Sequence, residues 1–151
     1  MSDGSGGQAA RVVAEARSWI GTPYRHQAAV RGAGADCLGL VRGVWRAVIG
    51  PEPEVVPAYT ADWSEASGRE DLLAAGLRWM GGKPVADMGL GDVVLFRMRG
   101  DAVAKHLGII AQIRPYPSFI HAYSGHGVVE SALSDPWVRR IVACFSFPAR
   151  G

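Results

Sequence analysis

The sequence predicts an α+β domain in which helices come first and strands follow. Apolar residues recur at helical spacing before residue 80, and short runs rich in β-branched residues follow residue 90. Tight turns separate those later runs. Helices that precede a series of strands indicate helices packed on one antiparallel sheet, rather than the alternating order of a parallel fold. We expect about five or six strands in this sheet.

The first helix is predicted from Ala9 onward. One face carries the apolar residues Val12, Val13, Ala16, Trp19 and Ile20. Gly21-Thr22-Pro23 ends the helix, because glycine suits a helix C-terminus and proline cannot continue one. Residues 1–8 are small and mostly polar, so we expect a flexible leader there and a single domain over 9–151.

The second helix is predicted to start after Asp36, whose carboxylate can accept hydrogen bonds from the free N–H groups of the first turn. Its apolar face carries Cys37, Val41, Val44, Trp45 and Val48. Gly39 and Gly43 lie one turn apart and would let another backbone approach closely. After the helix ends at Gly50-Pro51, we expect an insertion loop over 51–68 and a third helix over 70–80.

The strands are predicted after residue 90. They cover 93–96, 106–113, 118–123, 128–130 and 140–147. The turns Pro115-Tyr116-Pro117 and 124–127 separate neighbouring strands, so these strands should pair as hairpins.

Composition and charge exclude several classes of protein. The chain has 151 residues, 48% of them hydrophobic, which suits one soluble domain with a real core. A net charge of +2 without a basic run argues against nucleic-acid binding. No apolar run reaches the roughly 18 residues of a membrane span, and the N-terminus lacks a secretory signal. Only 2 cysteines are present, which excludes a disulfide scaffold and an all-cysteine metal site.

Cys37 is the cysteine whose position indicates chemistry. It follows the predicted N-cap Asp36, where unpaired N–H groups and the helix dipole favour a thiolate. The glycines of the loop before it leave room for a substrate. Asp36 acts in the opposite direction, because a nearby carboxylate disfavours a thiolate unless the cap bonds hold it aside. Most free cysteines are small buried hydrophobes, and Cys144 is expected to be one.

Two histidines are placed to act with such a thiol as base and orienting group. His106 opens one apolar strand, and His121 lies in the next strand across the Pro-Tyr-Pro turn. Facing residues of a hairpin come close, so a register that brings the two rings together is expected. Gly108, on the same face as His106, would leave an open cleft beside it. Alternatively, His106 is an ordinary histidine of a sheet edge.

No metal and no cofactor are expected, because the sequence has no His-x-x-x-His or Cys-x-x-Cys spacing and no acidic cluster near the histidines. Tyr24, just before the second helix, could hydrogen-bond near the thiol or a substrate carbonyl, or could simply pack in its loop. His26 is expected at the rim of the cleft. His126, between two glycines of a turn, is expected to be solvated.

Together these residues resemble the motifs of NlpC-type papain-like cysteine peptidases. The resemblance rests on Asp36-Cys37-Leu38-Gly39-Leu40, His106-Leu-Gly-Ile and His121-Ala, with Trp19-Ile-Gly-Thr-Pro-Tyr24 before them and Gly91-Asp92 opening a strand. It covers about residues 9–147. The form Gly-Thr-Pro-Tyr-Arg-His-Gln is similar to the cell-wall peptidases encoded with phage tails and gene transfer agents.

The resemblance implies a papain-like NlpC fold and hydrolysis of peptidoglycan stem peptides between D-glutamate and a diamino acid. Cys37 would be the nucleophile, His106 the general base and His121 the orienting third member, with the first two resting wholly or partly as a thiolate–imidazolium pair. Tyr24 would assist near the thiol or the oxyanion. The N–H of Cys37 would be one oxyanion donor, as the position at a helix start also indicates. Leu38 stands where many relatives have serine.

The implied partners are the stem peptide and a tail tip or hub protein of a phage-like particle, because the chain carries no wall-binding repeat. We expect synthesis in the cytoplasm without a signal peptide, followed by incorporation in the particle tail. Two alternatives stay open. One is a structural tail-tip component whose peptidase site is dispensable for assembly. The other is a papain-like enzyme that transfers acyl groups on another substrate.

Overall fold

The structure is a computed structural model that describes residues 4–53, 71–98 and 105–149. Its main sheet has six antiparallel strands in the order β3-β8-β4-β5-β6-β7. Their bounds are β3 (Gly81–Lys83), β4 (Val93–Phe96), β5 (His106–Gln112), β6 (Ser118–Tyr123), β7 (Gly127–Ala132) and β8 (Ile141–Ser146). The predicted α+β class and the number of strands are confirmed. All five predicted strands are present with ends within two residues of those expected, and β3 was not expected.

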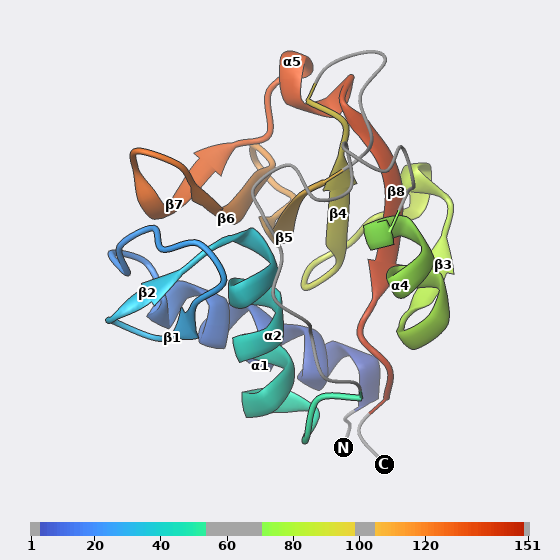
Figure 1. Cartoon of the computed structure of the whole chain (residues 1–151). Coiled ribbons are helices and arrows are strands. Elements are labelled where there is room, and N and C mark those ends of the chain that lie inside the picture. Colours follow the sequence, from blue (N-terminus) through green and yellow to red (C-terminus); the bar gives the residue numbers. More distant parts are fainter. Residues whose placement is uncertain (1–3, 54–70, 99–104, 150–151) are drawn as a thin grey trace.

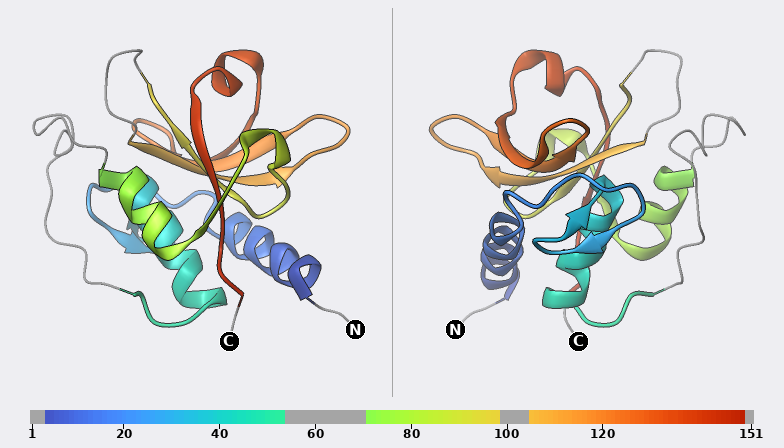
Figure 2. Two further views of the ribbon diagram at one scale, coloured as in Figure 1. Left: turned by 90° about the vertical axis from the view of Figure 1, so that its right-hand side faces the viewer. Right: turned by 60° about the vertical axis from the view of Figure 1, so that its left-hand side comes forward.

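The helices lie on both sides of this sheet. They are α1 (Gly4–Ser18), α2 (Cys37–Val48), α4 (Asp71–Trp79) and the short α5 (Asp135–Val138), with a 3-10 turn η1 (Val85–Asp87). In Figures 1 and 2, α1, α2 and α4 cover one face of the sheet and α5 covers the other. The three predicted helices are confirmed, whereas α5 was not expected.

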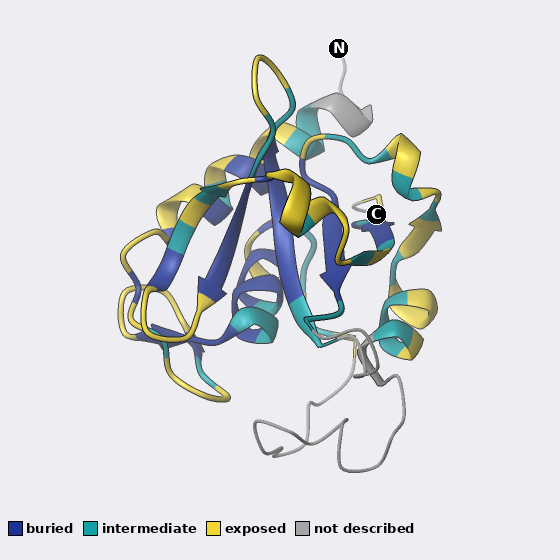
Figure 3. Cartoon of the chain, turned by 90° about the horizontal axis from the view of Figure 1, so that it is seen from above, coloured by how far each residue is buried: buried dark blue, intermediate teal, exposed yellow. Residues whose placement is uncertain are grey.

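Two apolar clusters fill the two faces because side chains alternate along each strand. The larger one packs the inner sides of α1 and α2 against Leu95, Ile109 and Ile120. The smaller one lies under α5 and includes Phe96, Ile110 and Phe119. Figure 3 shows the result as buried central strands surrounded by exposed loops and helix ends.

The start of α1 differs from the prediction. The helix begins at Gly4, so residues 4–8 of the expected leader are helical. Gln8 Nε2 donates to the main-chain oxygen of Pro148 at 2.8 Å, which ties the N-terminal part of α1 to the segment that follows β8. Ile20, expected on the apolar face, is 43% exposed because the helix ends at Ser18 and the chain turns away before it.

The loop before α2 also holds structure that the sequence pattern did not indicate. Its two short strands, β1 (Ala29–Val30) and β2 (Gly34–Ala35), form a separate antiparallel pair. Most of the expected insertion at 51–68 lies outside the described residues, and only 51–53 can be placed.

The two glycines of α2 have the close neighbours predicted for them, although of different kinds. A side chain at Gly39 would collide with the main-chain carbonyl of Ala28, so backbone approaches backbone there as expected. At Gly43 the neighbour is the indole of Trp19 instead. Both contacts seat α2 against α1 and the preceding loop, and this fixes the place of the residue that begins α2.

Candidate active site

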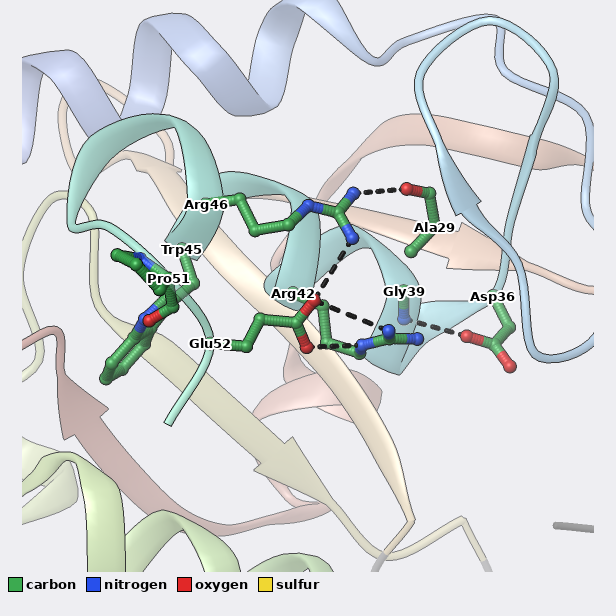
Figure 4. A network of polar contacts seen from close by, with 8 residues as sticks. All are labelled: Ala29, Asp36, Gly39, Arg42, Trp45, Arg46, Pro51 and Glu52. Atoms are coloured by element: carbon green, nitrogen blue, oxygen red, sulfur yellow. Dashed lines mark hydrogen bonds and ion pairs between the residues drawn. The ribbon is translucent and has the colours of Figure 1, made fainter. Parts of the chain in front are cut away.

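Asp36 fixes the start of α2 through both oxygens of its carboxylate. Oδ1 accepts from the N–H of Gly39 at 2.7 Å, a bond drawn in Figure 4, and Oδ2 accepts from the N–H of Gln27 at 2.7 Å. The predicted N-cap is confirmed. Gln27 has a φ of 65°, an unusual value for a residue with a side chain, and its bond to Asp36 holds the loop in that conformation.

The other end of α2 is fixed by Glu52. Figure 4 shows its carboxylate accepting from Arg42, at 2.7 Å from Nε, and from Arg46. Burial opposes ionisation of Glu52, yet the two guanidinium groups lower its pKa. Arg46 also donates to the carbonyl of Ala29 in β1. The helix that begins with Cys37 is therefore held at both ends.

The thiol of Cys37 meets the sheet at the first residues of β5. Sγ lies 3.5 Å from the carbonyl oxygen of Lys105, and the N–H of Leu107 hydrogen-bonds the sulfur and acts to lower the pKa of the thiol. These two contacts are on either side of His106. The pairing of β5 with β6 begins only at Ile109, which leaves the main chain around His106 available to the thiol.

A chain of hydrogen bonds runs from His106 into the sheet. His106 Nε2 lies 2.8 Å from Nδ1 of His121, whose Nε2 lies 2.9 Å from Oγ of Ser131 in β7. Ile109 pairs with Ile120, so the two histidines are diagonal neighbours rather than directly opposite. The expected contact between the two rings is present. This bond uses Nε2 of His106 and leaves its other ring nitrogen, Nδ1, outside the chain of hydrogen bonds.

Aromatic rings enclose the two histidines, and Trp137 of α5 is at the centre of them. Its ring stacks on His106 with centroids 5.7 Å apart and meets His121 edge-on at 5.2 Å. Phe119 lies 4.2 Å from the centroid of His121. A side chain at Gly108 would collide with Phe119. The expected open cleft beside Gly108 is therefore wrong, because an aromatic ring fills that space.

Burial is the main cause of the pKa shifts of the thiol and of both histidines. Burial raises the pKa of Cys37 to about 11, and Asp36 adds to the rise, while main-chain N–H groups oppose it. Burial, with a smaller effect of His121, lowers the pKa of His106 to about 3. Burial, with a smaller effect of His126, lowers that of His121 to about 4. These directions favour a neutral thiol and neutral imidazoles over the expected thiolate–imidazolium pair, which stays a prediction.

Tyr24 is held beside the start of α2. The N–H of Arg25 donates to the carbonyl of Ala35, and the N–H of Ala35 donates to the carbonyl of Pro23, so this loop runs alongside the residue before Asp36. Burial raises the pKa of Tyr24, and the charges of Cys37 and Asp36 raise it further. The phenol is thus within electrostatic reach of the thiol.

The remaining candidates lie outside this group. His26 is exposed, with Nδ1 3.8 Å from Oδ2 of Asp36. His126 is exposed and stacks on Tyr123, with centroids 5.2 Å apart. Cys144 is buried in the sheet, as expected. In the ranges that the structure describes, no three histidine, cysteine or acidic side chains gather as a metal-binding group, and no helix is long and apolar enough to cross a bilayer.

Two neighbours of the histidines were missed in the sequence. Trp137 follows Ser134-Asp135-Pro136, a typical helix start that could have indicated α5, although not its place over the histidines. Ser131 lies in β7 beyond the predicted end of that strand. Its contact with His121 depends on the pairing of β6 with β7, which sequence spacing does not determine.

No protein-family model matches the chain, and no curated protein matches it. Solved structures do. The NlpC/p60 domain of the peptidoglycan hydrolase SagA matches with a TM-score of 0.60 and 23% identity, over 92% of this chain and 98% of that one. An NlpC/p60 family protein from Bacillus cereus matches with a TM-score of 0.62 and 16% identity, over 90% of this chain and 39% of that one.

A third structure, from Staphylococcus aureus and described as similar to lipoprotein of the NLP/P60 family, matches with a TM-score of 0.60 and 17% identity. It covers 97% of this chain, which spans 42% of the other. In the second and third cases the chain thus corresponds to about two fifths of a longer protein. The chain has the papain-like fold of NlpC/p60 domains, as the sequence resemblance implied.

Proposed function

We propose that this chain is a cysteine peptidase that cleaves peptidoglycan stem peptides between D-glutamate and a diamino acid. The observation that carries the proposal is the thiol of Cys37 at a helix start, in contact with the main chain on both sides of His106. The fold shared with NlpC/p60 domains, one of them from a peptidoglycan hydrolase, supports the choice of substrate.

The reaction begins from the neutral pair. Sγ of Cys37 attacks the scissile carbonyl carbon while its proton moves to Nδ1 of His106, so that a buried thiolate need not form beforehand. The N–H of Cys37, at the first residue of α2, donates to the developing oxyanion. The His106 proton then goes to the leaving amine, the C–N bond breaks, and a thioester remains on Cys37.

Water completes the cycle. It attacks the thioester carbonyl as His106 takes one of its protons, and the C–S bond breaks to release the carboxylic acid and return the proton to the sulfur. His121 orients His106 throughout by accepting from its Nε2–H. We place Tyr24 beside the thiol as a further donor to the substrate carbonyl.

We further propose that the chain acts at the cell wall as part of a phage-like tail, bound to a tail tip or hub protein. This extends the resemblance of the motifs around Tyr24 and Cys37 to peptidases encoded with phage tails and gene transfer agents. Particles that carry Cys37→Ala should assemble normally and fail to penetrate the wall, whereas a purely structural role predicts normal penetration.

The test of the reaction uses purified stem peptides and mass spectrometry. The wild-type protein should release products cut between D-glutamate and the diamino acid, and Cys37→Ala should release none. Products from another bond would contradict the specificity, and cleavage by Cys37→Ala would contradict the mechanism.

A further inference from the structure

Ser131 makes the outermost contact of the histidine chain, with Oγ 2.9 Å from Nε2 of His121. Ser131 pairs with Phe119, and His121 pairs with Val129, so both side chains are on the face under α5. We propose that Ser131 is a positioning residue that sets the tautomer of His121 and so keeps Nδ1 of His106 free to take the thiol proton. This inference rests on the proposed function.

The argument follows the protons. A neutral imidazole carries one N–H, and His106 can act as base at Nδ1 only if that proton is on Nε2. Nε2 then donates to Nδ1 of His121, 2.8 Å away, which must be unprotonated. The proton of His121 is consequently on Nε2, and it points at Oγ of Ser131. This arrangement of protons, which we call the productive order, therefore needs a hydrogen-bond acceptor at residue 131.

The opposite order is unproductive. If His121 carries its proton on Nδ1, it donates to Nε2 of His106, and the proton of His106 is then on Nδ1, toward the thiol. The hydrogen bonds between His106, His121 and Ser131 then all reverse direction together. A serine hydroxyl can donate or accept, so it permits both orders, and transfer of the thiol proton to Nδ1 of His106 requires the productive one.

Burial makes this acceptor important. His121 is 0% exposed, so water does not replace a missing partner at its Nε2. Without the hydroxyl, the productive order leaves a buried N–H without an acceptor, whereas the reversed order leaves only a bare lone pair. Orphaned buried N–H groups are the rarer and less tolerated of the two. Loss of the hydroxyl should shift the population toward the unproductive order.

The matched variants are Ser131→Thr and Ser131→Val, which have nearly the same shape and differ in the hydroxyl. Both suit a strand. Ser131→Val should lower kcat about tenfold with KM unchanged, while Ser131→Thr stays within about twofold of the wild type. Ser118→Ala is the control, because Ser118 lies on the neighbouring strand and its hydroxyl bonds Glu130 instead of a histidine. It should keep the wild-type kcat.

A spectroscopic readout tests the same inference without any substrate. ¹⁵N chemical shifts of the imidazole nitrogens distinguish the two tautomers. In the wild type, His106 and His121 should both carry their protons on Nε2, and in Ser131→Val the Nδ1–H forms should appear. Thermal unfolding of the three variants identifies any loss of fold, which Ser131→Thr should not show.

The outcomes separate this inference from the proposed function. If the wild type cleaves no stem peptide but Ser131→Val changes the tautomers, the proposed function fails and the role of Ser131 stands. If Ser131→Val keeps both the wild-type kcat and the wild-type tautomers, the role of Ser131 is overturned and the peptidase stands. Equal losses in Ser131→Thr and Ser131→Val would also overturn it, because the hydroxyl would then make no difference.

Discussion

The two cysteines of this chain contact the same sheet in surroundings that look alike. Cys37 and Cys144 each have a carboxylate nearby, Asp36 and Asp92, and burial is the main cause that raises the pKa of both thiols to about 11. A raised pKa alone therefore does not identify a nucleophile. What differs is the set of groups that each sulfur can reach.

Cys37 is half-buried at a helix start, where the N–H groups of Leu107, Leu38 and Cys37 itself all act to lower its pKa. Cys144 is 1% exposed, and its sulfur lies 3.9 Å from Oδ2 of Asp92, a contact that raises its pKa further. The first thiol has main-chain donors and lies against the main chain on both sides of His106. The second thiol has an acceptor, Asp92, that stabilises its protonated form. A protonated thiol is suited to packing in a core.

The two carboxylates differ in the same way. Asp36 bonds main-chain N–H groups and so fixes the residue that follows it. Asp92 accepts from Nζ of Lys83 at 2.7 Å, from the N–H of Gly89 and from the hydroxyl of Ser146. Asp36 thus positions a reactive group, whereas Asp92 joins β3, β4 and β8.

The largest expected effect separates the two cysteines by activity. Cys37→Ala should lower kcat/KM for stem peptides by about 10³ or more, because the nucleophile is lost. Cys144→Ala should keep activity within about twofold and lower the free energy of unfolding by about 1 kcal/mol. Peptide hydrolysis and urea unfolding measure the two. Loss of activity in folded Cys144→Ala alone would reverse the assignment.

The second effect is the rate of alkylation by iodoacetamide. In the folded protein Cys37 should react at least about 100-fold faster than Cys144, because only Cys37 is accessible. Its rate should rise about tenfold per pH unit through neutral pH, because the thiolate fraction rises in that way below a raised pKa. Peptide mapping by mass spectrometry assigns each site. A fast rate that does not change with pH would indicate a thiolate–imidazolium pair instead.

The sequence predicted what depends on neighbours along the chain. Asp36 caps the helix that begins with Cys37 because that signal lies within four residues, and one turn brings His106 and His121 onto neighbouring strands. The sequence did not predict what depends on packing between distant elements. Trp137 lies over the histidines because β7 and β8 flank α5, and Phe119 fills the space beside Gly108. The sequence also did not predict how far the thiol and the two histidines are buried, and burial opposes the ions that a helix start favours.

A third effect separates the two carboxylates. Asp92→Asn should lower the free energy of unfolding by about 3 kcal/mol, because it leaves Lys83 without its buried partner. Asp36→Asn should lower it by about 1 kcal/mol or less, because asparagine is also a good N-cap.

Activity should show the opposite order, with Asp36→Asn the more impaired, since Gln27 and the start of α2 lose a charged acceptor. Urea unfolding and peptide hydrolysis on the same samples measure both. Equal losses of stability would remove the distinction between the two carboxylates.

The last effect concerns the dependence of stability on pH. Because burial holds the pKa values of His106 and His121 at about 3 and about 4, these rings stay neutral in the folded protein when they would already be protonated in the unfolded chain. Between about pH 6.5 and pH 4 the unfolded state therefore binds more protons, so stability falls as the pH falls, by about 1.4 kcal/mol per pH unit for each histidine. The share of His121 ends near pH 4 and that of His106 near pH 3, where each ring is protonated in both states.

His106→Gln should remove the share of this slope that belongs to one histidine, and glutamine keeps an N–H donor for His121. His26→Gln is the control, because His26 is exposed on a loop. Urea unfolding at several pH values measures the slope. A slope that His106→Gln leaves unchanged would mean that His106 takes up its proton as readily in the folded protein as in the unfolded one. Since burial opposes that, such a result would contradict the lowered pKa of His106. It would bring the expected thiolate–imidazolium pair back as the prediction for the Cys37 site and leave Cys144 as the neutral thiol of the two.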